Sequence, residues 1–517
     1  FMFQNCRALK NLTIPNFRTN KVKNMAYMFE HCLSLKSLDL SSFDTTKVTN
    51  MSHMFDNCWD IMQLDLSSFN TENVVDMSFM FYFDHSLTSL KISSFNTEKV
   101  INMSAMFNYC SKLTELNINN FKVNELVDMS FMFADMRELT SLDLSSFVTS
   151  NAKTMMHLFQ WDNNLRTINI DNFDTSKVTD MSFLFQGCSS LESINLSKFD
   201  TRAVITMESM FQDCSSLTIL DLSNFVTTSE LKDISSLFRF CTSLKRVDLS
   251  NLVTDKVIDM GYMFRHCESL EYLNLSNFVT TDVQNMNSMF EDCYSLTSLD
   301  VSSFNTFFVK DMGYMFNGCS SLTSLDLSKF NAYEVEEADF LFNNCHNLKS
   351  INLANFNTHK IKTMSYMFGN CKELSEINFG KLDTRNVEDM SYMFYNCESL
   401  SSIDLSKFST GKVIDMSHMF NNCTNLTSLD LSPFDTSNVT DMSYLFENCN
   451  NLISLNLASF DTSNVKNMEH MFKSCSSLEI LDLSNFNTNK CNKFDEIFES
   501  CYNMTVIIGN NENNSNL

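Results

Sequence analysis

Two sets of side chains recur along the chain and have the chemistry of binding surfaces. The first is a column of Asp and Asn, one residue per repeat, in which neighbouring repeats carry Asp at several places. We single out three of these pairs: Asp221 with Asp248, Asp300 with Asp326, and Asp404 with Asp430. Aligned carboxylates would form an acidic groove for a basic partner or for weakly held divalent cations. The alternative is a solvated, hydrogen-bonded ladder that keeps a sheet face soluble.

The second set is an aromatic column two residues after a recurrent methionine, where most repeats carry Tyr, Phe or His. Its tyrosines include Tyr262, Tyr314, Tyr366, Tyr392 and Tyr444. Tyrosine is favoured in protein interfaces, so an outward column of this kind would make a contact stripe. The alternative is that the rings lie over the loops of the next repeat and seal it.

Cysteine is the third recurrent residue with possible chemistry. Seventeen of the eighteen cysteines occupy one repeat position, where stacked neighbours would lie within disulfide range. The same position is filled by Asp84, Met136 and Asp162 in other repeats, which a disulfide framework should resist. The pattern therefore favours buried free thiols that act as small hydrophobic residues.

Catalytic and metal-binding motifs are missing from the sequence. The nine histidines are spread over the array without zinc-ligand spacing, and there is no Gly-rich phosphate loop, His-Glu-x-x-His, Gly-x-Ser-x-Gly or calcium loop. We therefore expect no enzyme activity, no cofactor and no dedicated metal site. The formal charge of −25 argues against nucleic acid as a partner, and no apolar run of 18 residues predicts a transmembrane segment.

The elements that position these columns are read from one repeat, 426–449. The cysteines recur every 26 residues, with a single step of 27 between Cys214 and Cys241. In Leu-x-x-Leu-x-Leu the last residues alternate apolar and polar, which predicts a short strand with one buried face. Asp441 resembles a helix N-cap, and Met442, Leu445, Phe446 and Cys449 then fall at the spacing of one apolar helical face.

These elements predict an α/β fold built as a curved leucine-rich-repeat solenoid. A parallel sheet would form its concave face and short helices its convex face. Residues 1–517 are expected to form a single array of about nineteen repeats, with regular repeats over 1–490 that start in the middle of a repeat. Residues 491–509 are expected to form an atypical C-terminal capping repeat, followed by a polar tail at 510–517.

The repeat resembles a known group. Met-Phe-x-Asn-Cys-x-x-Leu followed by Leu-Asp-Leu-Ser-x-Phe-x-Thr is similar to the 26-residue repeats of BspA-like leucine-rich repeat surface proteins, and the similarity covers essentially the whole chain. The resemblance implies an extracellular or cell-surface array used for adhesion, with an export signal or anchor outside the given segment. It identifies no ligand, because function does not follow from a repeat fold.

Two functional hypotheses follow. The first is a non-catalytic adhesion or interaction module that binds a protein or glycan on another cell or matrix along its concave face. The second is a structural component in which copies of the chain associate laterally into a coat, layer or filament, with the aromatic column as the contact.

Overall fold

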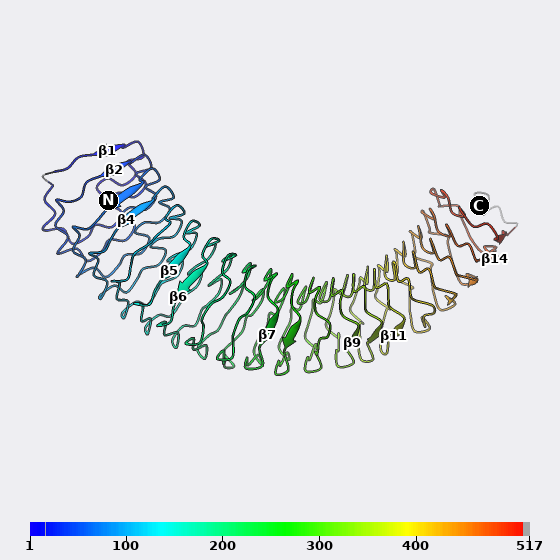
Figure 1. Ribbon diagram of the computed structural model, residues 1–517. Helices are drawn as coiled ribbons and strands as arrows, with labels where there is room; N and C mark the ends of the chain where they lie inside the picture. Colours follow the sequence, from blue (N-terminus) through cyan, green and yellow to red (C-terminus); the bar gives the residue numbers. More distant parts are fainter. Residues whose placement is uncertain (16, 510–517) are drawn as a thin grey trace. The chain divides into compact units, whose positions relative to one another are not determined.

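The computed structural model describes residues 1–15 and 17–509. These residues belong to two compact units, Phe1–Thr254 and the part of the chain from Asp255 onwards. Within each unit the backbone winds into successive coils, and each coil contains one repeat (Figure 1). The repeat deduced from the sequence is therefore the structural unit. That the repeats make one uninterrupted array stays a prediction.

Short strands lie where the Leu-x-Leu alternation predicts them. In the first unit they are β1 (Asn11–Leu12), β2 (Ser37–Leu38), β3 (Gln63–Asp65), β4 (Ser89–Lys91), β5 (Ser141–Asp143), β6 (Thr167–Asn169) and β7 (Arg246–Asp248). In the second they are β8 (Tyr272–Asn274), β9 (Ser324–Asp326), β10 (Ser350–Asn352), β11 (Glu376–Asn378), β12 (Ser428–Asp430), β13 (Ser454–Asn456), β14 (Ile480–Asp482) and β15 (Thr505–Ile507).

The strands pair in parallel with the strand of the next coil. Equivalent residues face each other, as Leu325, Ile351 and Ile377 do across β9, β10 and β11. The leucine or isoleucine in the middle of a strand points into the core, while the residues on either side of it point to solvent in most strands. The predicted parallel sheet with one buried face is therefore confirmed within each unit.

The predicted helices are wrong: residues 1–15 and 17–509 contain no helix. The segment from Met442 to Cys449 forms consecutive turns, in which Leu445 N donates to Met442 O at 3.4 Å and Cys449 N donates to Phe446 O at 3.1 Å. Tyr444 has a φ of 60°, in the left-handed region that a right-handed helix does not visit. An α/β description with short helices therefore does not apply.

Hydrogen bonds between coils take the place of the helix. The N–H groups of Met442, Tyr444, Phe446 and Asn448 donate to carbonyls of the following coil at 2.8–3.0 Å. Neighbouring coils lie close together, with the rings of Phe446 and Phe472 5.7 Å apart. A helix with its side chains is about 10 Å wide, so helices could not stack at this interval. Turns can stack at this interval, and each turn forms hydrogen bonds with the next coil.

Asp441, the expected helix cap, lies in this turn segment. Its Oδ1 accepts the N–H of Ser443 at 2.9 Å, the bond that an N-cap makes to its own chain. Its backbone, however, forms parallel bridges to Asp415 and Asn467 in the adjacent coils. The cap prediction is therefore wrong about the helix, although the side-chain hydrogen bond that it implies is present.

The core is the set of columns that the sequence predicts. Met442, Leu445, Phe446 and Cys449 are all buried, as are their counterparts in most coils. The cysteines are free, and most are fully buried. Cys449 Sγ donates to Phe420 O at 3.2 Å, and the same bond recurs along the column. Burial raises the pKa of the Cys449 thiol well above its ordinary value, so the thiols are neutral core residues.

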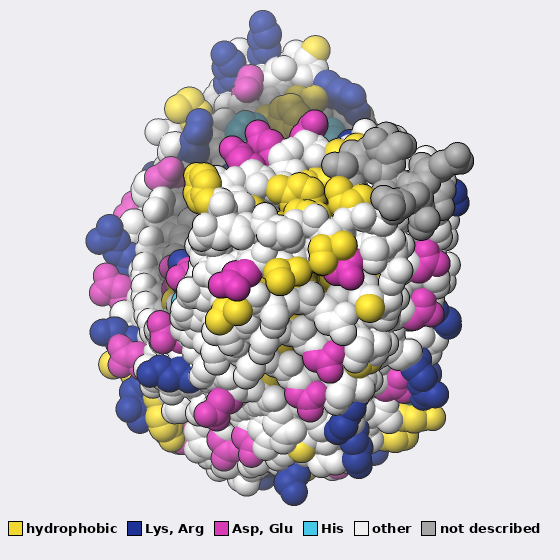
Figure 2. Space-filling model, turned by 90° about the vertical axis from the view of Figure 1, so that its right-hand side faces the viewer, with side chains coloured by type: hydrophobic (Ala, Val, Ile, Leu, Met, Phe, Trp, Pro, Cys, Tyr) yellow, Lys and Arg dark blue, Asp and Glu magenta, His cyan; other side chains and the backbone are white. Residues whose placement is uncertain are grey.

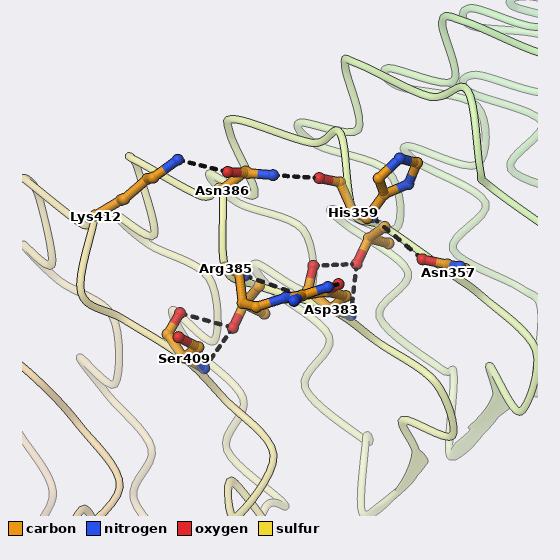
Figure 3. Close-up of polar contacts among 9 residues, drawn as sticks. Asn357, His359, Asp383, Arg385, Asn386, Ser409 and Lys412 are labelled. Atoms are coloured by element: carbon orange, nitrogen blue, oxygen red, sulfur yellow. Dashed lines mark hydrogen bonds and ion pairs between the residues drawn. The ribbon is translucent and has the colours of Figure 1, made fainter.

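Buried threonines and exposed asparagines tie neighbouring coils together (Figure 3). Thr384 Oγ1 donates to Ser409 O at 2.9 Å and accepts from Ser409 N at 2.7 Å. On the surface, Lys412 Nζ donates to Asn386 Oδ1 at 2.6 Å, and Asn386 Nδ2 donates to His359 O at 2.6 Å. One Asn side chain thereby connects three coils, which satisfies backbone groups that a turn would otherwise leave open.

The last described coil departs from the pattern. β15 pairs in parallel with β14, and Leu481 lies opposite Val506. Ile497 is buried, whereas Tyr502 is exposed. The assignment of 491–509 as a capping repeat stays a prediction, and the expected polar tail at 510–517 lies outside the described residues. The described residues also contain no helix with the length and apolar character needed to cross a membrane.

Candidate functional site

The six carboxylates singled out from the sequence are exposed on the strand face. Asp248, Asp326 and Asp430 are the last residues of β7, β9 and β12. The other three, Asp221, Asp300 and Asp404, are also exposed and occupy the same position in coils without an assigned strand. In the first unit, Ile219 bridges Arg246, which places Asp221 and Asp248 on adjacent coils. We call the Asp and Asn side chains at this position the acidic row.

Each of the six carboxylates accepts a hydrogen bond from the turn that follows it. In all six, Oδ1 accepts the N–H of the serine two residues on, at 2.9–3.0 Å. Bonds from that serine lower the pKa of Asp221, Asp300, Asp326, Asp404 and Asp430. The row is therefore ionised at neutral pH. The Asp-Leu-Ser triplet is the sequence signal for this turn. The sequence-based expectations did not include the turn.

A groove lies on the strand face over β9, β10 and β11. It has a volume of about 630 Å³ and is lined by Asp326, Asn352, Asn378 and Asp404 among other residues. Asn352 Nδ2 donates to Asp326 Oδ1 at 3.1 Å, and Asn378 Nδ2 donates to Asn352 Oδ1 at 2.9 Å. Two predicted site residues, Asp326 and Asp404, are thus brought to one groove, and the amides between them form the hydrogen-bonded ladder.

Lys91 is the basic member of this row. Its Nζ lies 2.9 Å from Asp65 Oδ2 in the preceding coil, and both side chains are more than half exposed, at 66% and 53%. Hydrogen bonds from Ser67 and Lys91 lower the pKa of Asp65 to about 2. A cationic side chain thus binds a carboxylate of the acidic row on the open face.

The aromatic column is a stack of rings rather than a stripe of free faces. In the second unit the rings of Tyr314, Phe340, Tyr366, Tyr392, His418, Tyr444 and His470 follow one another at 4.2–4.7 Å, with interplanar angles of 7–10°. The side chains are half-buried. Their faces cover one another, which leaves the ring edges to solvent. Tyr262 is also half-buried, and it carries the guanidinium of Arg265 over its ring at 5.8 Å.

Two groups of histidine and carboxylates have ligand atoms within 4.8 Å of one another: Glu30, His53 and Asp56, and His470, Glu496 and Glu499. In the second group the ammonium of Lys473 already contacts both glutamates. In the first, His53 Nδ1 lies 2.7 Å from Asp56 Oδ2, and the Gln4 amide donates to Glu30. Protein groups thus already neutralise or hydrogen-bond these acids.

Acidic side chains stand singly among basic and uncharged ones on the face in Figure 2. This agrees with the composition, in which 62 acidic residues face 37 basic ones. Charged side chains are therefore dispersed over this face. The regular spacing of the acidic row follows from the sequence repeat.

Seven overlapping segments match a protein family described as "Mycoplasma protein of unknown function, DUF285": 1–88, 58–167, 161–272, 232–351, 262–379, 339–429 and 415–516. Together they cover nearly the whole chain. No curated protein matches the sequence.

The solved structures with some similarity include three bacterial leucine-rich repeat proteins. One from Bacteroides ovatus is 14% identical, with 86% of each chain covered and a TM-score of 0.29. A leucine rich cell surface protein from Faecalibacterium prausnitzii is 16% identical, with 62% of this chain and 79% of that chain covered and a TM-score of 0.30. One from Eubacterium ventriosum is 15% identical, with the same coverage and a TM-score of 0.29.

Proposed function

Since the chain belongs to the family described as Mycoplasma proteins of unknown function, DUF285, which carries no assigned activity, we propose a function from its surfaces. It is a non-catalytic interaction module that binds a protein or glycan partner along the strand face. The acidic row supplies carboxylates for basic side chains, and its amides supply donors and acceptors for hydroxyl groups.

The observation that carries the proposal is the contact of Lys91 with Asp65. A lysine side chain on this face contacts a carboxylate at 2.9 Å while both side chains remain exposed to solvent. In the groove over β9–β11 the chain offers Asp326 and Asp404, and Asp300 extends the acidic row on the coil before β9. Single exposed ion pairs contribute only about 0.2–1 kcal/mol, so a partner needs several at once. A repeated row provides them.

The setting that we propose is the cell surface, with adhesion to another cell or to matrix as the role. The similarity of the repeats to those of BspA-like surface proteins supports this setting. Many weak contacts along a repeated face also suit adhesion, because linked contacts raise the overall affinity without any strong single site.

The test removes charge from the acidic row while preserving its turns. A fluorescent decapeptide of alternating Lys and Gly serves as the basic probe, and its binding is followed by anisotropy at low salt. In Asp300→Asn/Asp326→Asn/Asp404→Asn the amide keeps the Oδ1 acceptor that ends each strand, as Asn352 does in the native chain. We expect roughly tenfold weaker binding, because about 0.5 kcal/mol is lost at each position.

The matched control is Asp435→Asn. Asp435 is exposed and accepts the N–H of Ser437 at 3.0 Å in the same way, but it lies in the turn beyond the strand face. Binding of the decapeptide should be unchanged in this variant. Equal affinity of the triple variant and the native protein would rule out the strand face as the basic-partner site.

Lateral association through the aromatic column is the second candidate. The ring edges of Tyr314, Tyr366 and Tyr392 are available, whereas their faces are covered by neighbouring rings. Replacing all three with His keeps the stack and removes the hydroxyl groups. If the native chain self-associates in sedimentation velocity and this variant does not, the aromatic column is the contact. If both behave alike, another surface is responsible.

A further inference from the structure

The aromatic column of the first unit lacks a ring at Ala105, Ser209 and Ser236, and of these only Ala105 has a ring in the coil on either side. Tyr27, His53 and Phe79 stack at 4.5 and 4.6 Å, and Phe131, His157 and Phe183 stack at 4.3 and 4.4 Å. The coil between Phe79 and Phe131 carries Ala105 at the same position. Ala105 has a φ of 52°, the same left-handed backbone as its aromatic counterparts. One ring is therefore missing from a stack whose backbone is unchanged.

A pocket occupies the place of the missing ring. It has a volume of about 490 Å³, and its lining includes Phe79, Ala105, Asn108, Phe131 and Trp161. At the spacing of neighbouring column rings, 4.3–4.6 Å per step, two steps would set the rings of Phe79 and Phe131 about 9 Å apart, which is the space that one planar ring fills with a stacking contact on each face. Among the described residues no ring is stacked in this space, although the ring of Tyr82, which also lines the pocket, meets Phe79 edge-on at 5.4 Å.

Asn108 is the polar group that the missing ring leaves without a partner. Three residues after a column ring, other coils place a side chain that bonds the ring edge: His53 Nδ1 lies 2.7 Å from Asp56 Oδ2, and Asn421 Nδ2 lies 3.1 Å from His418 Nδ1. Asn108 holds that position relative to Ala105. It is 5% exposed, and its Oδ1 has no hydrogen-bond partner among the described residues. A buried acceptor in this state costs free energy until a donor arrives.

Another single-coil gap, at Ser288 in the other unit between Tyr262 and Tyr314, is filled by the chain itself. There the guanidinium of Arg265 lies over the ring of Tyr262 at 5.8 Å. Its Nε lies 2.8 Å from Oε2 of Glu291, the buried residue three positions after Ser288. A planar group on the ring face, held by the residue three positions on, therefore restores what the missing ring would supply. At the Ala105 coil, no planar group among residues 1–15 and 17–509 is stacked on the facing sides of Phe79 and Phe131.

We propose that the Ala105 gap is a binding site for one planar aromatic ring with a hydrogen-bond donor on its edge, such as a phenol or an imidazole. The ring would insert between Phe79 and Phe131, and its O–H or N–H would donate to Asn108 Oδ1. Asp128 and Asp135 also line the pocket, so the site suits a neutral or cationic ring and disfavours an anion. The ring comes either from a free small molecule or from a side chain of a partner protein.

Titration with p-cresol, the ring of tyrosine, tests the site through ligand-observed NMR and the fluorescence of Trp161. Two matched probes separate the contributions: 4-methylanisole lacks the donor, and 4-methylcyclohexanol lacks the planar ring. We expect p-cresol to bind at least fivefold more tightly than either. Acetyl-Gly-Tyr-Gly-amide distinguishes the sources, since its binding points to a partner side chain, whereas binding of p-cresol alone points to a free ring.

Two variants locate the site. Ala105→Tyr completes the stack, so it should abolish p-cresol binding without lowering the midpoint of thermal unfolding. Asn108→Leu removes the acceptor, so it should weaken p-cresol about tenfold and leave 4-methylanisole unchanged. The matched control is Asn421→Leu, the same change at the equivalent position of a coil whose ring, His418, is present, and it should not affect p-cresol.

Undiminished p-cresol binding by Ala105→Tyr would overturn the proposal. Equal affinity of the native protein for p-cresol and 4-methylcyclohexanol would overturn it as well. The pocket shares no lining residue with the groove over β9–β11, so this test and the test of the strand face succeed or fail separately.

Discussion

At the scale of single residues, the core contains two carboxyl groups where most coils have a thiol. Asp84 and Asp162 are fully buried in the cysteine column. Their Oδ1 atoms accept the N–H of Cys58 at 2.7 Å and of Met136 at 2.8 Å, while both Oδ2 atoms have no partner among the described residues. Burial raises the pKa of both carboxyls well above the ordinary value. Both groups are therefore neutral in the folded protein at acidic pH, and ionising them costs stability.

The double replacement Asp84→Cys/Asp162→Cys should stabilise the protein at pH 7. A thiol at this position donates to a backbone carbonyl, as Cys110 Sγ does to Phe81 O at 3.2 Å. Each replacement removes a carboxyl that must take up a proton on folding at pH 7, and each unit by which burial raises its pKa costs about 1.4 kcal/mol there. Because the folded pKa is raised, the penalty exists only above the unfolded pKa near 4. The gain should therefore shrink as the pH falls toward 4, and chemical unfolding at pH 7 and pH 4 measures it.

The reciprocal control is Cys319→Asp, which places a third carboxyl in the column of the other unit. It should lose stability at pH 7 and lose less at pH 4, with the opposite sign from the double replacement. A gain that is the same at both pH values would show that ionisation of Asp84 and Asp162 is not its source.

At the scale of elements, the aromatic column contributes to stability through its stacking. Tyr366 lies between Phe340 at 4.7 Å and Tyr392 at 4.2 Å. Tyr366→Ser removes both contacts, and at about 0.5–1.5 kcal/mol per aromatic pair it should cost about 1–3 kcal/mol. Tyr366→His should cost much less, because His418 occupies the same position between Tyr392 and Tyr444. Urea unfolding compares the two, and equal losses would show that stacking is not the cause.

The sequence predicted the repeat, the strand and the buried columns, because each depends on the pattern of residues within one coil. It failed at the helix for a physical reason. Met442, Leu445, Phe446 and Cys449 are buried as predicted, and their spacing fits one face of a helix as well as two successive turns. Hydrogen bonds to the next coil, such as that from Tyr444 N to Glu469 O at 2.8 Å, favour two successive turns over a helix. A pattern confined to one segment does not contain these bonds.

The candidate sites were predictable only in part. Exposure of the six aspartates follows from their place in Leu-x-Leu, and the structure places them on the strand face. The half-buried stacking of the tyrosines does not follow from a helical face, because the position has left-handed backbone. Ala105 and Asn108 were not predicted as site residues, because an alanine in an aromatic column looks like ordinary sequence variation. That the alanine leaves a gap becomes evident only from the spacing of the rings on either side.

At the scale of the whole molecule, charge opposes folding. The formal charge is −25, and the acidic row places Asp on neighbouring coils at several points along the chain. Such repulsion is screened by salt, and the screening length falls from about 10 Å at 0.1 M to about 3 Å at 1 M. We expect the midpoint of thermal unfolding to rise by several degrees between 0.02 and 0.5 M NaCl, as scanning calorimetry can measure.

Magnesium chloride at matched ionic strength is the control for this prediction. If magnesium chloride acts by screening alone, it should raise the midpoint of thermal unfolding about as much as sodium chloride does. A clearly larger rise with magnesium would mean that the carboxylates bind the divalent ion specifically, and no rise with either salt would show that repulsion is not limiting.

The direction of the hydrogen bonds between coils has a consequence for how such a chain evolves. In the turn segment, N–H groups such as that of Phe446 donate to the following coil, whereas just before this segment Thr440 N donates to Ile414 O of the preceding coil at 2.8 Å. Each coil therefore offers donors and acceptors to both neighbours, in a pattern that repeats from junction to junction. A duplicated or deleted repeat meets the same partners at the new junction, so in-frame gain or loss of 26 residues needs no compensating mutation there.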